Sequence, residues 1–188
     1  MDGLHEGTDG DDNADDAELV RRTQAGSREA FGVIVARHQR NIYQLCYRFV
    51  GNHEDAADLA QDVFVRAYRA IRGFKGESAV GTWLHRIGVN VCLNRKAVKT
   101  PQFDDLDSVE PLATAEHGDA VLLRGERAAR VRAAIVRLPP KQRATLILRT
   151  YRDLSHEEIA GILGSSVGAT KANFFHALAN LKKLLTEK

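Results

Sequence analysis

The stretch that decides the fold is residues 155–185, with the sequence SHEEIAGILGSSVGATKANFFHALANLKKLL. Ser155 followed by Glu158 is a capping box, which starts a helix because each side chain satisfies a free backbone N–H. Gly164 breaks this helix, and Ser166 is suited to cap a second one. Two short helices that meet at a glycine-containing turn form a helix-turn-helix, whose second helix can enter the DNA major groove. Nucleic acid is therefore the first partner to consider, and a helical hairpin built only for packing is the alternative.

The second helix of this motif is expected to have an apolar side and an outward side. The apolar stripe is expected to be Val167, Thr170, Phe174, Leu178, Leu181 and Leu185. The outward side is expected to be Ala169, Ala172, Asn173, His176, Ala179, Asn180 and Lys183, with Lys171 and Phe175 on its flank. Asn can read adenine, Lys and His can meet phosphate or guanine, and small Ala residues allow a close approach. No Arg is present on this side, so strong guanine readout is not expected.

Composition favours an all-α protein, because 44% of the 188 residues are hydrophobic and only 6% are aromatic, and β-branched runs are short. Cys46 and Cys92 lie far apart in apolar helical sequence, which predicts reduced core residues. The sequence has no CxxC motif and its His residues are scattered, so neither a metal nor another cofactor is expected. The acidic N-terminal segment is unlike a signal peptide, and no apolar run is long enough for membrane insertion. These features predict a cytoplasmic protein.

The net charge of +2 conceals four blocks of different sign. Residues 1–18 hold eight acids and no Lys or Arg, and residues 99–119 hold six acids and one base. Residues 19–98 hold 13 bases and six acids, and residues 120–188 hold 13 bases and five acids. Two basic blocks separated by an acidic segment predict two modules that contact a polyanion, although charged, solvated helix faces would give the same pattern.

The helical pattern divides the chain into two small helical domains. Residues 1–16 are predicted to be a disordered acidic tail, and residues 17–98 a first domain of about four helices. Residues 99–119 contain two prolines and are predicted to be a flexible acidic linker. Residues 120–188 are predicted to be a second domain of about four helices, which contains the helix-turn-helix.

Capping residues mark the expected helix boundaries. Ser27 is expected to start a long helix that ends at Gly51, and Asn52 or the residue after it is expected to start the next. Thr82 is expected to cap the last helix of the first domain. The Pro139-Pro140 pair is expected to separate two helices of the second domain.

The expected helix at residues 54–71 carries Asp58, Gln61 and Asp62 at positions i, i+3 and i+4, beside Phe64. This spacing places the three polar side chains in one patch next to an apolar anchor. The patch is either a solvated helix face or a surface that docks onto an Arg-rich protein partner.

Residues 74–90 combine aromatic side chains, glycines and bases with Asn90. That mixture suits stacking on unpaired bases and hydrogen bonding to their edges. Trp83 has apolar helical neighbours and is expected in the core, whereas Phe74 lies in the expected loop and is expected at the surface.

Several of these segments together resemble a known family. They are DLAQDVFVRAY at residues 58–68, FKGES at 74–78, TWLHRI at 82–87 with Asn90, and LPPKQR at 138–143 before the helix-turn-helix. In this order they are similar to the bacterial extracytoplasmic-function RNA polymerase sigma factors. The resemblance implies a sigma factor that binds core RNA polymerase and directs promoter recognition, −10 melting and transcription initiation. The first domain would correspond to region 2 and the second to region 4.

The resemblance also implies roles for individual residues. Those expected to bind polymerase are Asp58, Gln61, Asp62 and Phe64. Those expected at the −10 element are Phe74, Lys75, Ser78, Arg86, Asn90, Asn94, Arg95 and Lys96. Those expected at the −35 element are Lys171, Ala172, Asn173, Phe175 and His176. An anti-sigma factor is a further partner that the resemblance implies.

Two other classes of protein are alternatives to a sigma factor. A free-standing helix-turn-helix regulator would bind duplex DNA without polymerase, and the acidic helix and the aromatic loop argue against it. A helical enzyme is disfavoured because the sequence has no paired carboxylates, nucleophile motif or phosphate-binding glycine loop. The chain is therefore expected not to be an enzyme.

Overall fold

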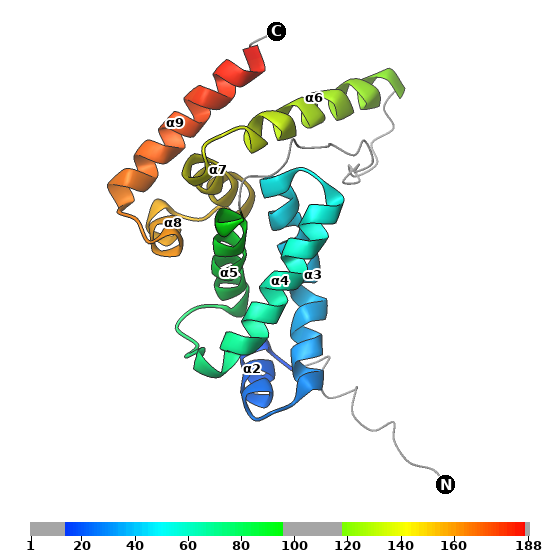
Figure 1. The fold of residues 1–188 in the computed structure, drawn as a ribbon, viewed down its shortest axis with the longest axis vertical. Helices are drawn as coiled ribbons and strands as arrows, with labels where there is room; N and C mark the ends of the chain where they lie inside the picture. Colours follow the sequence, from blue (N-terminus) through cyan, green and yellow to red (C-terminus); the bar gives the residue numbers. More distant parts are fainter. Residues whose placement is uncertain (1–13, 96–117, 187–188) are drawn as a thin grey trace.

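The computed structural model describes residues 14–95 and 118–186, and in these two ranges it contains helices and no strands. The first range holds α2 (Asp16–Gln24), α3 (Arg28–Val50), α4 (His53–Ala70), a 3-10 turn (Ile71–Gly73) and α5 (Val80–Asn94). The second holds α6 (Gly118–Val136), α7 (Pro140–Arg152), α8 (His156–Leu163) and α9 (Val167–Thr186). The all-α prediction, with four helices in each half, is confirmed (Figure 1).

Most of the predicted helix boundaries are correct because they depend on local capping. Ser27 and Asn52 each accept a hydrogen bond from the backbone N–H three residues ahead, at 3.1 and 2.8 Å. Ser155 forms the complete capping box that starts α8. Gly51 and Gly164 end α3 and α8 in the left-handed region, with φ of 80° and 58°, where a residue without a Cβ is favoured.

Two boundaries differ from the prediction. Helix α5 begins at Val80, so Thr82 lies inside its first turn and does not cap it. Burial explains the earlier start, because Val80 is 5% exposed and packs into the core. Helix α6 begins at Gly118, inside the segment 99–119 that was predicted to be a linker. The rest of that predicted linker, and most of the predicted tail, lie outside the described residues.

In the N-terminal half, α3 and α4 lie side by side, and α5 packs against both (Figure 1). The close approach of α5 to α3 depends on Gly88, where an added Cβ would lie 2.9 Å from Leu45 Cδ2. The largest fully buried side chains of this half are Leu19, Ile34, Ile42, Leu45, Val50, Val63, Ile71 and Leu84. These contacts hold the outward faces of α4 and α5 in a fixed relation.

In the C-terminal half, α9 packs on α7, α8 and α6. Leu138, Ile147, Leu148 and Ile159 are its largest fully buried side chains. Helices α8 and α9 meet at the turn that follows Gly164, which confirms the predicted helix-turn-helix. No helix in the described ranges is long and apolar enough to cross a membrane.

The two halves pack directly on one another, with α7 against the ends of α3 and α5 (Figure 1). Arg143 of α7 donates to the Phe49 carbonyl at the C-terminal end of α3, at 2.7 Å. This contact places a cation at a helix end whose last carbonyls lack partners within the helix. Nearby, the Arg48 guanidinium lies 4.2 Å from the centre of the Tyr151 ring. Burial at the junction lowers the pKa of both arginines.

Candidate functional site

The acidic patch predicted on α4 lies at the surface. Asp58 and Gln61 are exposed, whereas Phe64 is half-buried and packs against the core. Asp62 forms an ion pair with Arg66 one turn away, with an N–O distance of 2.9 Å. Because this pair is largely exposed, it contributes little to stability. A protein partner can therefore replace it at little cost.

Beside this patch runs a groove of about 1060 Å³ between α3 and α4. Its apolar lining includes Phe31, Phe64 and Tyr68, and the Phe31 and Tyr68 rings meet edge to face with centroids 4.9 Å apart. The charged residues that line it are Arg28, Arg40 and Arg69. Sequence reasoning missed this groove because half of its wall comes from α3, and the pairing of two helices cannot be read from either one alone.

Helix α5 presents Arg86, Asn90 and Asn94 as one exposed stripe, because the three residues are spaced four apart. The loop before α5 adds Lys75, which is exposed, and Ser78, which is half-buried. Five of the eight residues predicted at the −10 element therefore lie on the outer side of α5 or in the loop before it. Their mixture of amide, hydroxyl and cationic groups can contact base edges and phosphates.

Phe74 differs from the expectation of a surface aromatic. It is half-buried and packs on Trp83, with ring centroids 4.9 Å apart and an interplanar angle of 41°. The Phe74 carbonyl also accepts a hydrogen bond from the Gln24 side chain at 2.9 Å. Trp83 is half-buried against the core, as expected. The contact between the two rings joins the loop before α5 to the first turn of that helix.

Arg95 also differs from the expectation of a DNA contact, because its guanidinium is already bound within the protein. It pairs with Asp55 in the first turn of α4. Hydrogen bonds from Asn52 and then from Arg95 lower the pKa of Asp55. Arg95 thus joins the end of α5 to the start of α4. Lys96 lies outside the described residues.

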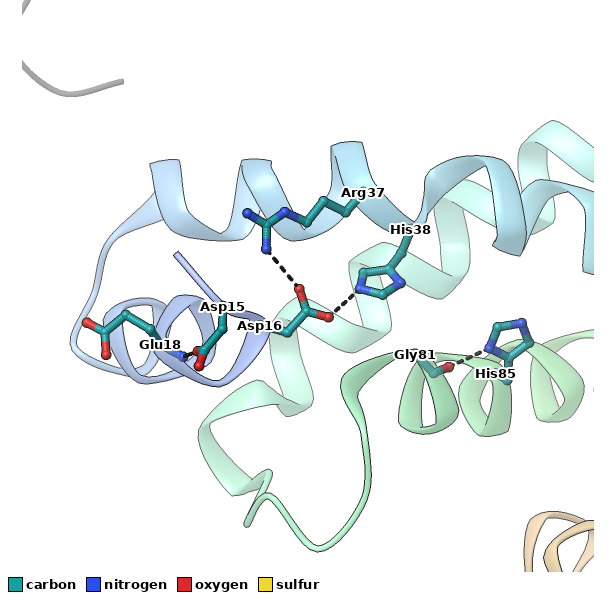
Figure 2. A network of polar contacts seen from close by, with 7 residues as sticks. All are labelled: Asp15, Asp16, Glu18, Arg37, His38, Gly81 and His85. Carbon is teal, nitrogen blue, oxygen red and sulfur yellow. Dashed lines mark hydrogen bonds and ion pairs between the residues drawn. The ribbon is translucent and has the colours of Figure 1, made fainter. Parts of the chain in front are cut away.

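Beneath the exposed stripe of α5, His85 is 3% exposed and its Nδ1–H donates to the Gly81 carbonyl (Figure 2). Burial lowers the pKa of His85 to about 4, so its ring is neutral at pH 7. Close by, Asp16 at the start of α2 contacts His38 at 2.8 Å and Arg37 at 3.2 Å (Figure 2). These contacts join α2 to α3. No signal in the sequence indicated that His85 is buried.

The predicted −35 residues lie on α9, which runs along the outside of the molecule (Figure 1). Lys171, Ala172 and His176 are exposed and Asn173 is half-buried. Phe175, expected on the flank, is 69% exposed and is the most exposed of the large hydrophobic residues in the described ranges.

The buried side of α9 is rotated from the predicted stripe. Thr170 is buried as expected, but Ala177 is the other fully buried residue of this helix. Leu178, predicted on the buried stripe, is 46% exposed. Asn180, predicted outward, is half-buried and donates to the Gln142 side chain of α7 at 2.8 Å. The rotation arises because α7 and α8 both pack on α9, and the sequence pattern alone does not specify their positions.

Cys46 and Cys92 are free thiols that the fold brings together, although they are far apart in the sequence. Donation of a hydrogen bond by the Cys92 thiol to Cys46, together with burial, raises the pKa of Cys92. Among the described residues, no group of three or more His, Cys, Asp or Glu side chains could hold a metal ion.

Two protein-family models match the chain. Residues 34–100 match Sigma-70 region 2, and residues 128–181 match Sigma-70 region 4. The first match contains α4 and α5 with their candidate residues, and the second contains α7, α8 and most of α9. Each match therefore falls within one of the two helical halves.

Curated relatives extend the similarity to most of the chain. The RNA polymerase sigma-H factor of Pseudomonas aeruginosa is 36% identical over 180 residues, which are 90% of this chain and 93% of the relative. The ECF RNA polymerase sigma-E factor of Escherichia coli is 34% identical over 172 residues, 86% and 90% of the two chains.

Solved structures show the same helical arrangement. CnrH, determined in complex with the cytosolic domain of CnrY, is 29% identical with a TM-score of 0.63, covering 90% of this chain and 96% of that one. The sigma factor RpoE of Bartonella quintana, determined with the anti-sigma factor NepR, has a TM-score of 0.58 at 20% identity. It covers 84% of this chain and 98% of its own, and it supports the fold alone.

Proposed function

Because the chain belongs to the extracytoplasmic-function family of RNA polymerase sigma factors, it binds core polymerase and directs promoter recognition, and we propose here which surfaces do so. The observation that carries the assignment is that both family matches fall on the halves that hold the candidate surfaces. We infer that the protein acts in the cytoplasm, where core polymerase is found, and that it has no catalytic activity of its own. A free-standing regulator is not favoured.

We propose that α4 docks on core polymerase through Asp58, Gln61, Asp62 and Phe64. Two exposed or partly exposed acids beside an apolar anchor are suited to an Arg-containing surface, and mutual attraction would orient the encounter. The groove between α3 and α4 adds apolar area next to the acids. Docking would be strongest where the acidic patch on α4 adjoins the apolar groove.

The double variant Asp58→Lys, Asp62→Lys tests this docking surface. It should lose co-purification with core polymerase, because both acids would become repulsive, while circular dichroism stays helical. The double variant Glu126→Lys, Glu157→Lys is the matched control, since it makes the same charge change at exposed positions of the other half. Normal co-purification of the α4 variant would refute the docking surface.

We propose that the −10 element binds at the start and outer stripe of α5. Arg86, Asn90 and Asn94 would contact the DNA, with Lys75 and Ser78 contributing from the loop. We propose that Phe74 and Trp83 together form the apolar floor of a pocket that holds an unpaired nucleotide base, since Phe74 is half-buried against Trp83. Arg95 would act by holding α5 on α4, because Asp55 already binds it. Lys96 is proposed as a further backbone contact.

A template with a pre-melted −10 region tests the assignment, because it removes much of the cost of opening the duplex. Asn90→Ala should impair permanganate-detected opening on duplex promoters and should still weaken binding to the bubble. Phe74→Ala should show both defects, whereas Phe74→Leu should retain more binding by preserving the contact with Trp83. Wild-type opening and bubble binding by the Asn90 variant would show that the pocket lies elsewhere.

We propose that α9 reads the −35 element through Lys171, Ala172, Asn173, Phe175 and His176. The −35 and −10 elements lie about 25 base pairs apart, roughly 85 Å along B-form DNA at about 3.4 Å per pair. The two halves are in direct contact in the structure. We therefore infer that they separate when both elements are bound, which would break the contact of Arg143 with α3.

We also propose that an anti-sigma factor binds this protein. The relative CnrH was determined with a second protein bound, and it is 29% identical to this chain over most of its length. The apolar groove beside the proposed polymerase-docking patch would suit such an inhibitor, since occupying it would compete with polymerase. Added core polymerase should then displace the inhibitor, and simultaneous binding of both would contradict this model.

A further inference from the structure

The outward face of α9 is centred on an aromatic side chain. The fully buried residues Thr170 and Ala177 define the inner side of the helix. At 100° per residue, Phe175 lies close to the direction opposite these two. It is 69% exposed, and the His176 ring meets its edge with centroids 5.7 Å apart and an interplanar angle of 73°. The ring is therefore oriented by a neighbour and points away from the core.

Two of the four residues one turn away from Phe175 are small, and the other two are Lys171 and Leu178. Ala172 and Ala179 lie one turn before and one turn after it, and both are exposed. Alanine side chains allow a helix backbone to approach a groove closely, so a large ring between them becomes the most protruding group. Lys171 is exposed on the flank, where it can meet a phosphate.

The face has no arginine, because none occurs between Val167 and Thr186. The commonest specific contact in the major groove, an Arg bidentate to guanine, is therefore not available to α9. A phenyl ring has no hydrogen-bonding group and would leave polar base edges unsatisfied. The one apolar group that the bases display in the major groove is the C5-methyl of thymine.

We propose that Phe175 packs on the C5-methyl group of a thymine in the −35 element, and that this contact is a main determinant of the −35 sequence. The inference rests on the proposed function, in which α9 lies in the major groove of that element. The preferred −35 element thus contains at least one A·T pair whose thymine faces Phe175.

Replacing thymine by deoxyuridine tests the contact directly, because it removes the methyl group and leaves the base pairing intact. The −35 element is first selected from duplexes with a randomised −35 region and a fixed −10 region, using core polymerase with the full chain. Each thymine of the selected element is then replaced in turn. At one or two positions the substitution should weaken holoenzyme binding about fourfold, the effect of burying one methyl group.

Three variants make the test specific to Phe175. Phe175→Ala should weaken binding to the thymine duplex and bring the thymine-to-uracil ratio close to one. Leu178→Ala is the matched control, since it removes an exposed apolar side chain from the same helix and should preserve the ratio. Lys171→Ala should weaken both duplexes equally and lower the dependence on salt.

The outcomes separate this inference from the proposed function. If an element is selected and Lys171→Ala weakens its binding, but every uracil duplex binds like its thymine parent, then the thymine contact is refuted and the −35 surface stands. Retention of the thymine-to-uracil ratio by Phe175→Ala would also refute the contact. If no −35 sequence is selected and neither variant changes binding, both the contact and the proposed −35 surface are refuted.

Discussion

Moderate acidification should destabilise the protein through His85, the buried histidine of α5. Its ring is 3% exposed, and its Nδ1–H donates to the Gly81 carbonyl within the first turns of the helix. Among the described residues, its Nε2 atom is buried and has no hydrogen-bond partner. A proton on Nε2 would therefore bring a charge into the core with no acceptor. The nearby positive charge of Arg152 adds to this cost.

The magnitude follows from the pKa of the ring in the two states. Burial lowers the pKa of His85 from 6.5 in an exposed histidine to about 4 in the fold. The unfolded chain therefore takes up this proton first as the pH falls, so the neutral ring favours the folded state fully above pH 6.5. This contribution is lost as the pH falls from 6.5 towards 4, and it amounts to about 3 kcal/mol in total and about 2 kcal/mol by pH 5.

Urea unfolding of wild type and His85→Gln at pH 7.5 and pH 5 would measure this effect. A glutamine can still donate to the Gly81 carbonyl but does not titrate, so its loss of unfolding free energy on acidification should be smaller by about 2 kcal/mol. His176→Gln is the control, because His176 is exposed and its variant should behave like wild type. Equal losses in wild type and His85→Gln would show that His85 is not the titrating group.

Four other substitutions test the packing and capping described above. Gly88→Ala should lower the free energy of unfolding by about 1 kcal/mol, because overpacking against Leu45 exceeds the gain in helix propensity. Gly32→Ala, at an open helical position, should instead raise the free energy of unfolding by about 1 kcal/mol. A stabilising effect of Gly88→Ala would contradict the close contact with Leu45. Arg143→Met should loosen the contact between the halves and increase the radius of gyration measured by X-ray scattering, and an unchanged radius would argue against a latch at this contact. Ser155→Ala should cost about 1 kcal/mol in unfolding free energy by removing the capping box of α8, and no measurable loss would mean that this cap is dispensable.

The sequence was sufficient wherever the physical cause is local. The helices that follow Ser27, Asn52 and Ser155 were predicted because a capping side chain satisfies an N–H three residues away, and the same holds for the ends at Gly51 and Gly164. Capping residues did not predict the helix start correctly where a tertiary contact determined it. Thr82 has the chemistry of a cap, but α5 already begins at Val80, whose side chain is buried in the core.

The candidate residues divide in the same way. Lys171, Ala172 and His176 were placed on the outside of α9 by helical periodicity, and they are exposed there. Phe74 and Arg95 were expected to be available to DNA, yet one packs on an aromatic ring and the other binds a carboxylate. The first contact depends on the path of the loop between Phe74 and Trp83, and the second joins Arg95 to Asp55 on another helix, so neither could be identified from the sequence pattern.

The sequence by itself therefore determined the helical class, the helix-turn-helix and the family, because capping, periodicity and motif order are properties of neighbouring residues. Only the tertiary structure decided that Phe175 stands at the centre of the outward face of α9, since that depends on how α7 and α8 pack against this helix. It likewise decided the burial of His85, the groove between α3 and α4 and the contact of Arg143 with α3. Each depends on which distant helices share a surface, and burial there changes what a side chain can bind or ionise.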